Sequence, residues 1–126
     1  MSTNTGHPES LEALNSALDQ QVLSGDILGA FEKFYADDVV MVENFDAPKV
    51  GKDANREFEK QFLASVAEFH GAQVLSSAVN EKEGVSFSEW EMEVTFKEWG
   101  RKKMNQVAVR RWKNGQIVHE RFYYKG

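Results

Sequence analysis

The first half of the chain carries apolar residues at helical spacing. Four of them recur every three or four positions: Leu11, Leu14, Leu18 and Val22. This period predicts an amphipathic helix, with Ser10 or Glu9 as its N-cap and Gly25 just beyond its end. A second, shorter helix should follow Asp26, because the next apolar residues also share one helical face: Ile27, Ala30, Phe31 and Phe34.

A β-branched run, VVMVEN at residues 39–44, follows the turn-like sequence ADD. Such a run predicts a first strand between two helical segments. Asp53 has the residue type of a helix N-cap and should start a third helix. The apolar stripe expected on that helix consists of Phe58, Phe62, Leu63 and Val66.

Beyond residue 68 the apolar period changes from helical to two, which is typical of half-buried strands. Strands are expected at residues 68–79, 85–96, 103–112 and 116–124, with turns at 81–84, 98–101 and 114–115. Three helices followed by antiparallel strands predict an α+β fold, with the helices packed on one face of a curved sheet. Residues 9–126 should form one domain, preceded by a loose tail at residues 1–8.

The clearest period-two segment is SEWEMEVTF, at residues 88–96. Trp90, Met92, Val94 and Phe96 should face the helices, and Glu89, Glu91, Glu93 and Thr95 the opposite side. The three aligned carboxylates do not predict a metal site, because residues two apart on a strand point in parallel and ligands must converge. We expect a solvated or subunit-facing surface instead.

Charge and composition narrow the possible partners. The chain has 126 residues, 15 Lys and Arg against 20 Asp and Glu, and no cysteine. The net charge of -5 argues against nucleic acid as a partner, and the missing cysteines exclude thiolate chemistry and disulfides. Three dispersed histidines provide no ligand spacing for a metal. No apolar run approaches the roughly 18 residues of a membrane span, so a soluble, cytoplasmic protein is expected.

Three segments together resemble the nuclear transport factor 2-like superfamily, and within it the SnoaL-like, polyketide cyclase-related group. They are LSGDILGAFEKFYADDVVMVEN (residues 23–44), VGKDANREFEKQF (50–62) and RWKNGQIVHERFYY (111–124). The resemblance implies a cystatin-like cone, in which a curved, mostly antiparallel sheet wraps around helices and leaves an apolar ligand-binding cavity. It also implies a homodimer through the convex sheet face and chemistry without a cofactor.

The catalytic sets of characterised relatives are missing from the matching positions. A ketosteroid isomerase would have an aspartate where this chain has Asn44, an aspartic acid near Ala108 and a tyrosine near Leu18. A limonene epoxide hydrolase shares the asparagine, but its tyrosine corresponds to Val42. Its Asp-Arg-Asp set would fall on Trp90, Met92, Val94 and Phe122. The aspartate that often ends polyketide cyclases is here Lys125.

The last hairpin decides which polar groups face inward. A two-residue Asn114-Gly115 turn would set Arg110 opposite His119. A three-residue loop of residues 113–115 would pair Arg110 with Val118 and Ala108 with Glu120, and we favour this register. It directs Glu120, Phe122 and Tyr124 to the concave side, and His119, Arg121 and Tyr123 outward.

Two functions are compatible with this pattern. In the first, the protein is a cofactor-independent acid-base enzyme of isomerase, cyclase or hydrolase/lyase type acting on a small apolar molecule. Glu120 would be its acid or base, and Arg110 the partner that sets its pKa. The ligand would be held by Asn44, Trp90, Met92, Phe96, Gln106, Phe122 and Tyr124. In the second, Glu120 and Arg110 form a structural pair in a non-catalytic ligand-binding or dimeric interaction module.

Overall fold

The structure is a computed structural model, and it describes residues 10–125. Three helices and six strands follow one another along the chain: α1 (Leu11–Leu23), α2 (Ile27–Phe34), β1 (Tyr35–Glu43), β2 (Lys49–Val50), α3 (Lys52–Ala64), β3 (Val66–Asn80), β4 (Val85–Phe96), β5 (Gly100–Lys113) and β6 (Gln116–Tyr124). The expected tail at residues 1–8 and the alternative cap Glu9 lie outside the described residues.

The first two helices begin where the sequence predicts. The Ser10 hydroxyl accepts a hydrogen bond from the Ala13 amide at 3.1 Å, and Asp26 caps α2 in the same way. The prediction of Asp53 as the cap of α3 was wrong. Gly51, at φ 96°, is the residue before this helix, and the Asp53 carboxylate pairs with Arg56 at 2.7 Å instead.

The end of α3 also differs from its prediction. The helix ends at Ala64, so Val66 belongs to β3 and not to the apolar helical stripe. The Ser65 amide donates to the carbonyl of Gln61, and the Ser65 hydroxyl donates to that of Phe62 at 2.6 Å. These bonds satisfy carbonyls that a helix end leaves free, and the chain then turns directly into the sheet.

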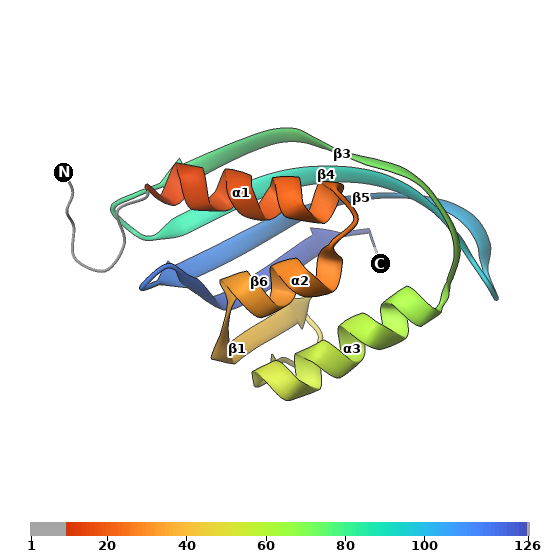
Figure 1. The fold of residues 1–126 in the computed structure, drawn as a ribbon, viewed down its shortest axis with the longest axis horizontal. Coiled ribbons are helices and arrows are strands. Elements are labelled where there is room, and N and C mark those ends of the chain that lie inside the picture. Colours follow the sequence, from red (N-terminus) through yellow and green to blue (C-terminus); the bar gives the residue numbers. More distant parts are fainter. Residues whose placement is uncertain (1–9, 126) are drawn as a thin grey trace.

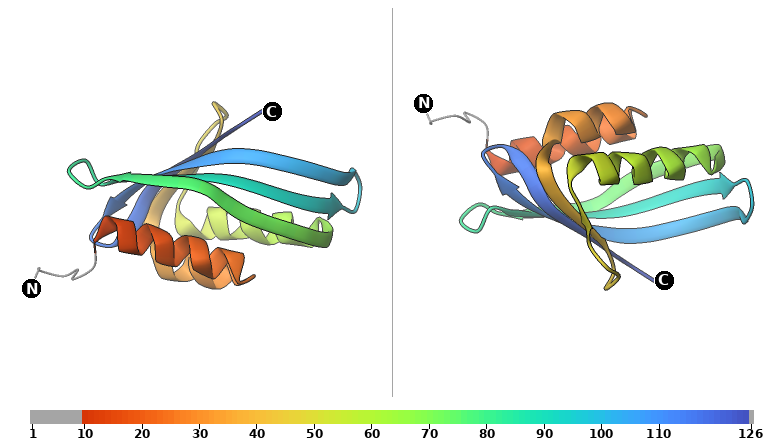
Figure 2. Two further views of the ribbon diagram at one scale, coloured as in Figure 1. Left: turned by 90° about the horizontal axis from the view of Figure 1, so that it is seen from above. Right: turned by 90° about the horizontal axis from the view of Figure 1, so that it is seen from below.

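All three helices cover one face of a single curved sheet (Figures 1 and 2). Its strand order is β2-β1-β6-β5-β4-β3, with β1 and β6 parallel and every other neighbouring pair antiparallel. The sheet does not close into a barrel. We call the covered side the concave face and the other side the convex face. No helix within residues 10–125 is long and apolar enough to cross a membrane.

The apolar core lies between α1, α2 and the middle of the sheet. Its buried members include Leu18, Phe31, Val39 and Ile117. The Phe31 ring stacks on that of Tyr35, with 4.9 Å between centroids, at the junction of α2 and β1. On β4 the even positions Trp90, Val94 and Phe96 are buried as predicted, while Glu89 on the other face is exposed.

The hairpin of β5 and β6 has neither of the two predicted registers. Its turn is the two-residue Asn114-Gly115, with φ of 53° and 78°, and Lys113 lies opposite Gln116. A bulge at Val118 then shifts the register, so that Arg110 lies opposite Glu120 and Ala108 opposite Phe122. The bulge has a packing reason. Ile117 and Glu120 are an odd number of residues apart, yet both are fully buried, and only an extra residue lets both face the concave side.

Candidate functional site

Seven polar side chains from five elements meet beneath α1 on the concave face. We call them the buried network: Asn15 and Asp19 of α1, Tyr35 of β1, Ser86 and Ser88 of β4, Arg110 of β5 and Glu120 of β6. All are less than a tenth exposed, so each needs a partner inside the protein. The alternation of the strands brings them together, because Arg110 lies opposite both Ser86 and Glu120.

Arg110 is the centre of the buried network. Its Nε donates to Glu120 Oε2 at 2.8 Å, and its Nη1 donates to Asp19 Oδ1 at 2.7 Å and to Asn15 Oδ1 at 2.8 Å. Burial alone would lower the pKa of Arg110, but the charges of Glu120 and Asp19 outweigh it and hold the pKa above its ordinary value. Two carboxylates therefore enclose one permanent cation.

Glu120 is enclosed on both of its oxygens. Tyr35 donates its hydroxyl hydrogen to Glu120 Oε1 at 2.6 Å, and Arg110 occupies Oε2. The side chain has no exposed surface, and burial raises its pKa against the opposing effects of Arg110 and Tyr35. Burial and the charge of Glu120 also raise the pKa of Tyr35 well above its usual range, so the phenol stays protonated. These contacts are those of a satisfied structural pair.

Next to the buried network the concave face becomes more open. Met92, Gln106 and Phe122, all predicted ligand contacts, are half-buried there together with Met104. Met92 lies opposite Met104, and the Gln106 position borders both Trp90 and Tyr124. We call these four half-buried residues the concave patch. Two other predicted contacts, Trp90 and Phe96, are less than a tenth exposed and belong to the core.

The two remaining predicted ligand contacts join β6 to the end of β1. Asn44 sits in the left-handed region at φ 51°, and its Oδ1 accepts from the Tyr124 amide at 2.8 Å. The Tyr124 hydroxyl donates to Glu43 at 3.0 Å, and burial raises the pKa of Tyr124 to about 12. The amide oxygen of Asn44 is thus engaged in turn formation, the structural role of an asparagine at a strand end.

Glu59 of α3 is a candidate site residue that the sequence did not predict. It is half-buried on the helix face shared by Asn55, which is 1% exposed, and Phe62, whose ring contacts that of Phe96. Burial and the negative charges of Glu120 and Glu43 raise the pKa of Glu59 to about 7. Within residues 10–125, neither a hydrogen-bond donor nor a cation offsets this rise. Glu59 is therefore poised to gain or lose a proton near neutral pH.

Four residues of the buried network continue apolar patterns that are visible in the sequence. Asn15 and Asp19 follow Leu14 and Leu18 on α1, so they extend its apolar stripe by one position. Ser86 and Ser88 continue the inward series of β4 toward its start. Glu59 had a weaker signal, its one-turn spacing from Asn55 and Leu63. In each case the spacing indicated a buried polar residue, but it could not indicate the hydrogen-bond partner of that residue.

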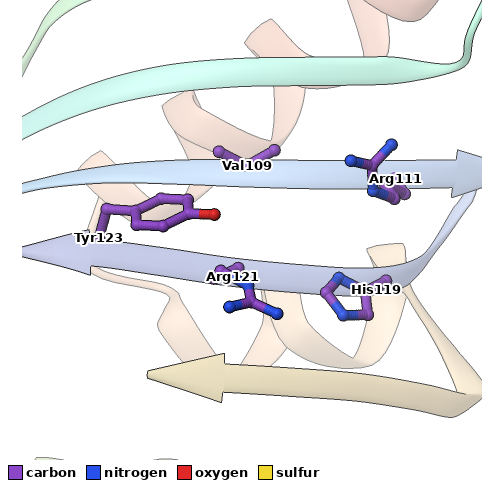
Figure 3. A pocket seen from close by; sticks show the side chains of 5 residues that line it. All are labelled: Val109, Arg111, His119, Arg121 and Tyr123. Carbon is purple, nitrogen blue, oxygen red and sulfur yellow. The ribbon is translucent and has the colours of Figure 1, made fainter. Parts of the chain in front are cut away.

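Residues 10–125 hold no group of three or more His, Cys, Asp or Glu side chains that could bind a metal ion. His70 contacts the Thr95 hydroxyl at 2.7 Å. His119, Arg121 and Tyr123 lie on the convex face, as predicted (Figure 3). Pairing of two copies through this face stays a prediction.

Known proteins with the same architecture support the assignment of the fold. A SnoaL-like polyketide cyclase, by its description, from Mesorhizobium loti is 31% identical, covering 92% of this chain and 100% of its own, with a TM-score of 0.80. A Xanthomonas campestris protein, also described as a polyketide cyclase, is 19% identical. The match covers 91% of this chain and 90% of that protein, with a TM-score of 0.75. A Catenulispora acidiphila protein with a ketosteroid isomerase-like fold, solved in complex with trimethylamine, is 13% identical. The match covers 87% of this chain and 84% of that protein, with a TM-score of 0.71.

No curated protein matches the chain with significance. The model of the SnoaL-like domain matches residues 18–124, which include the whole sheet and most of the buried network. On this match, and on the identity to the Mesorhizobium loti protein, the chain belongs to the SnoaL-like domain family.

Proposed function

We propose that this protein is a cofactor-independent acid-base enzyme that binds a small, largely apolar molecule on the concave patch. Two similar proteins, from Mesorhizobium loti and Xanthomonas campestris, are described as polyketide cyclases, and a carbonyl compound with acidic C–H bonds fits that description. The half-buried thioether and aromatic side chains of Met92, Met104 and Phe122 suit an apolar body, and the Gln106 amide suits a carbonyl oxygen.

The observation that carries this proposal is the position of Glu59, which is half-buried on α3 and lies within reach of the charges of Glu43 and Glu120. Phe122 of the concave patch lies opposite Glu43 and two residues beyond Glu120 on β6. A general base works best when its pKa lies near the working pH, and the pKa of Glu59 is raised to about 7. In the proposed step the Glu59 carboxylate takes a proton from the carbon next to the carbonyl. The C–H electron pair moves into an enolate, and the protonated carboxyl group later returns its proton to the product.

The sequence suggested Glu120 as the proton carrier, and we now propose Glu59 in its place. Both Glu120 oxygens are occupied, so proton transfer to a ligand would first have to break its bond to Tyr35 or Arg110. Glu120 keeps a role through its charge, which contributes to the raised pKa of Glu59. We propose that Arg110 holds Glu120 in place and touches no substrate.

The second candidate is a ligand-binding module without chemistry. The closed contacts of Glu120 and Asn44 favour it, because two polar groups predicted to meet a ligand are bonded within the protein. Such a module would bind an apolar molecule on the same patch and leave its C–H bonds unchanged.

Hydrogen-deuterium exchange separates the two functions without knowledge of the full reaction. A panel of small cyclic ketones would be incubated with the protein in D2O, and deuterium at the α-carbon followed by mass spectrometry. The proposed enzyme should accelerate exchange for at least one ketone, and Glu59→Gln should slow it by about 100-fold or more. Glu57→Gln, an exposed change on the same helix, is the matched control.

Two results would contradict the enzyme. One is ketone binding at the concave patch, seen as amide chemical-shift changes at Met92 and Phe122, with exchange no faster than in buffer. That outcome supports the binding module. The other is full exchange activity in Glu59→Gln, which would remove Glu59 from the mechanism.

A further inference from the structure

A depression of about 410 Å³ lies on the convex face, on the side of the sheet opposite the proposed reaction site. It is lined by Val109 and Arg111 of β5 and by His119, Arg121 and Tyr123 of β6 (Figure 3). We call these five residues the basic pocket. The proposed function makes no use of any of them.

The basic pocket has positive charge without a matching carboxylate. Among the described residues, neither Arg111 nor Arg121 forms a salt bridge, whereas Arg101 on the same sheet pairs with Glu93 at 2.6 Å. Burial and the charges of Arg121 and Arg111 lower the pKa of His119, so the charges acting on this imidazole are positive ones. Such a site stands out in a chain whose net charge is -5.

Arg121 is held in position before any ligand arrives. Its Nη1 donates to the Asn44 carbonyl oxygen at 3.0 Å, and its guanidinium lies 5.6 Å from the Phe45 ring centroid and 5.9 Å from that of Tyr123. These contacts reduce the side-chain entropy that an arginine loses on binding. One bond to Asn44 leaves most of its five N–H donors for another acceptor.

The strand register brings the second arginine close. Arg111 lies directly opposite His119, and Val109 lies opposite Arg121, so the four residues form two adjacent cross-strand pairs on one face. Val109 is half-buried and forms an apolar floor, and the Tyr123 ring adds an apolar wall beside Arg121. Two guanidinium groups therefore border a partly apolar hollow.

We propose that the basic pocket binds the oxyanion of a small organic molecule, a carboxylate or phosphate group attached to an apolar body. Guanidinium groups bind such oxyanions through paired, charge-assisted hydrogen bonds. Val109 and the Tyr123 ring contact the apolar body. The site is separate from the concave patch and gives the protein a second, anionic ligand.

An amide NMR titration tests this proposal on the full chain. The probes are inorganic phosphate, phenyl phosphate and, as a neutral control, phenol. Both phosphates should shift the amide signals of the basic pocket and leave those of Met92 and Phe122 unchanged. Phenyl phosphate should bind several-fold more tightly than inorganic phosphate because it also covers Val109, and phenol should not bind there.

Variants make the test specific. Arg111→Gln and Arg121→Gln should each weaken phenyl phosphate binding by about tenfold or more. Arg101→Gln removes the same charge from the same strand, but from an arginine already paired with Glu93, and should leave the affinity unchanged. Thermal unfolding of each variant shows whether it is folded, and the exposed Arg111 keeps the test available if Arg121→Gln is unstable.

Three results would overturn the proposal. The first is an equal loss in Arg101→Gln, which would mean general attraction by positive charge. The second is equal affinity for the two phosphates, which would mean that Val109 and the Tyr123 ring make no contact with an apolar body. The third is that neither phosphate shifts the amide signals of the basic pocket. This result would overturn the proposal for a monomer, and equally for a dimer whose interface covers the depression.

Discussion

Replacing Glu59 with glutamine should remove a pH dependence from the stability of the folded protein. In the fold the pKa of Glu59 is raised from 4.5 to about 7 by burial and by the charges of Glu120 and Glu43. Between these two values the folded state holds a proton on Glu59 that the unfolded state has released. Rising pH therefore favours unfolding.

The sign and size follow from proton linkage. The contribution of Glu59 is fully present below pH 4.5 and is lost as the pH rises through about 7. Each pH unit between the two values corresponds to about 1.4 kcal/mol, which sets an upper value of about 3.4 kcal/mol for the shift of the Glu59 pKa. Water screens part of this effect at a half-buried group, so we expect about 2 kcal/mol.

Urea unfolding at a series of pH values from 4.5 to 8 measures this contribution. The wild-type free energy of unfolding should fall by about 2 kcal/mol more over this range than that of Glu59→Gln. The difference between the two proteins isolates Glu59, because the histidines and the other carboxyl groups are common to both. Glu57→Gln, exposed on the same helix, should follow the wild-type curve.

Parallel wild-type and Glu59→Gln curves would refute the reasoning. They would mean that the Glu59 carboxylate is well hydrated and that its pKa is ordinary in the folded protein. The base proposed for the concave patch would then lack its main physical support. A steeper fall in Glu59→Gln than in the wild type would contradict even the sign of the shift.

Other substitutions test the buried network and the two sheet faces. Glu120→Gln should cost about 3–5 kcal/mol in urea unfolding, because the Arg110 cation loses a buried partner; a cost equal to that of the exposed Glu89→Gln would contradict a structural pair. Tyr35→Phe should cost about 1–3 kcal/mol, since Glu120 Oε1 loses its donor. Asn44→Ala should cost about 1–2 kcal/mol through its left-handed φ and its lost bond to the Tyr124 amide, with Asn44→Gly less affected. If two copies pair through the convex face, Phe87→Asp should yield monomers in analytical ultracentrifugation, because this ring is exposed there.

Most secondary structure could be predicted because its causes are local. Alternating residues from Trp90 to Phe96 had to place one set of side chains on each face, and β4 has the predicted bounds. The same rule directed Glu120 inward and His119 outward. The sequence was a poorer guide at α3, where a capping residue type at Asp53 competed with the backbone freedom of Gly51.

The sequence by itself predicted a buried Glu120 with Arg110 as its partner, because the favoured hairpin register put both on inward positions of neighbouring strands. Only the tertiary structure decided their register, through a bulge that buries Ile117 and Glu120 on the same side. It also decided that Asp19, 91 residues from Arg110 in the sequence, is the second carboxylate bound to Arg110. The pKa of Glu59 is likewise tertiary, since it depends on charges from β1 and β6. Periodicity fixes which way a side chain points, whereas packing between distant segments fixes what it meets.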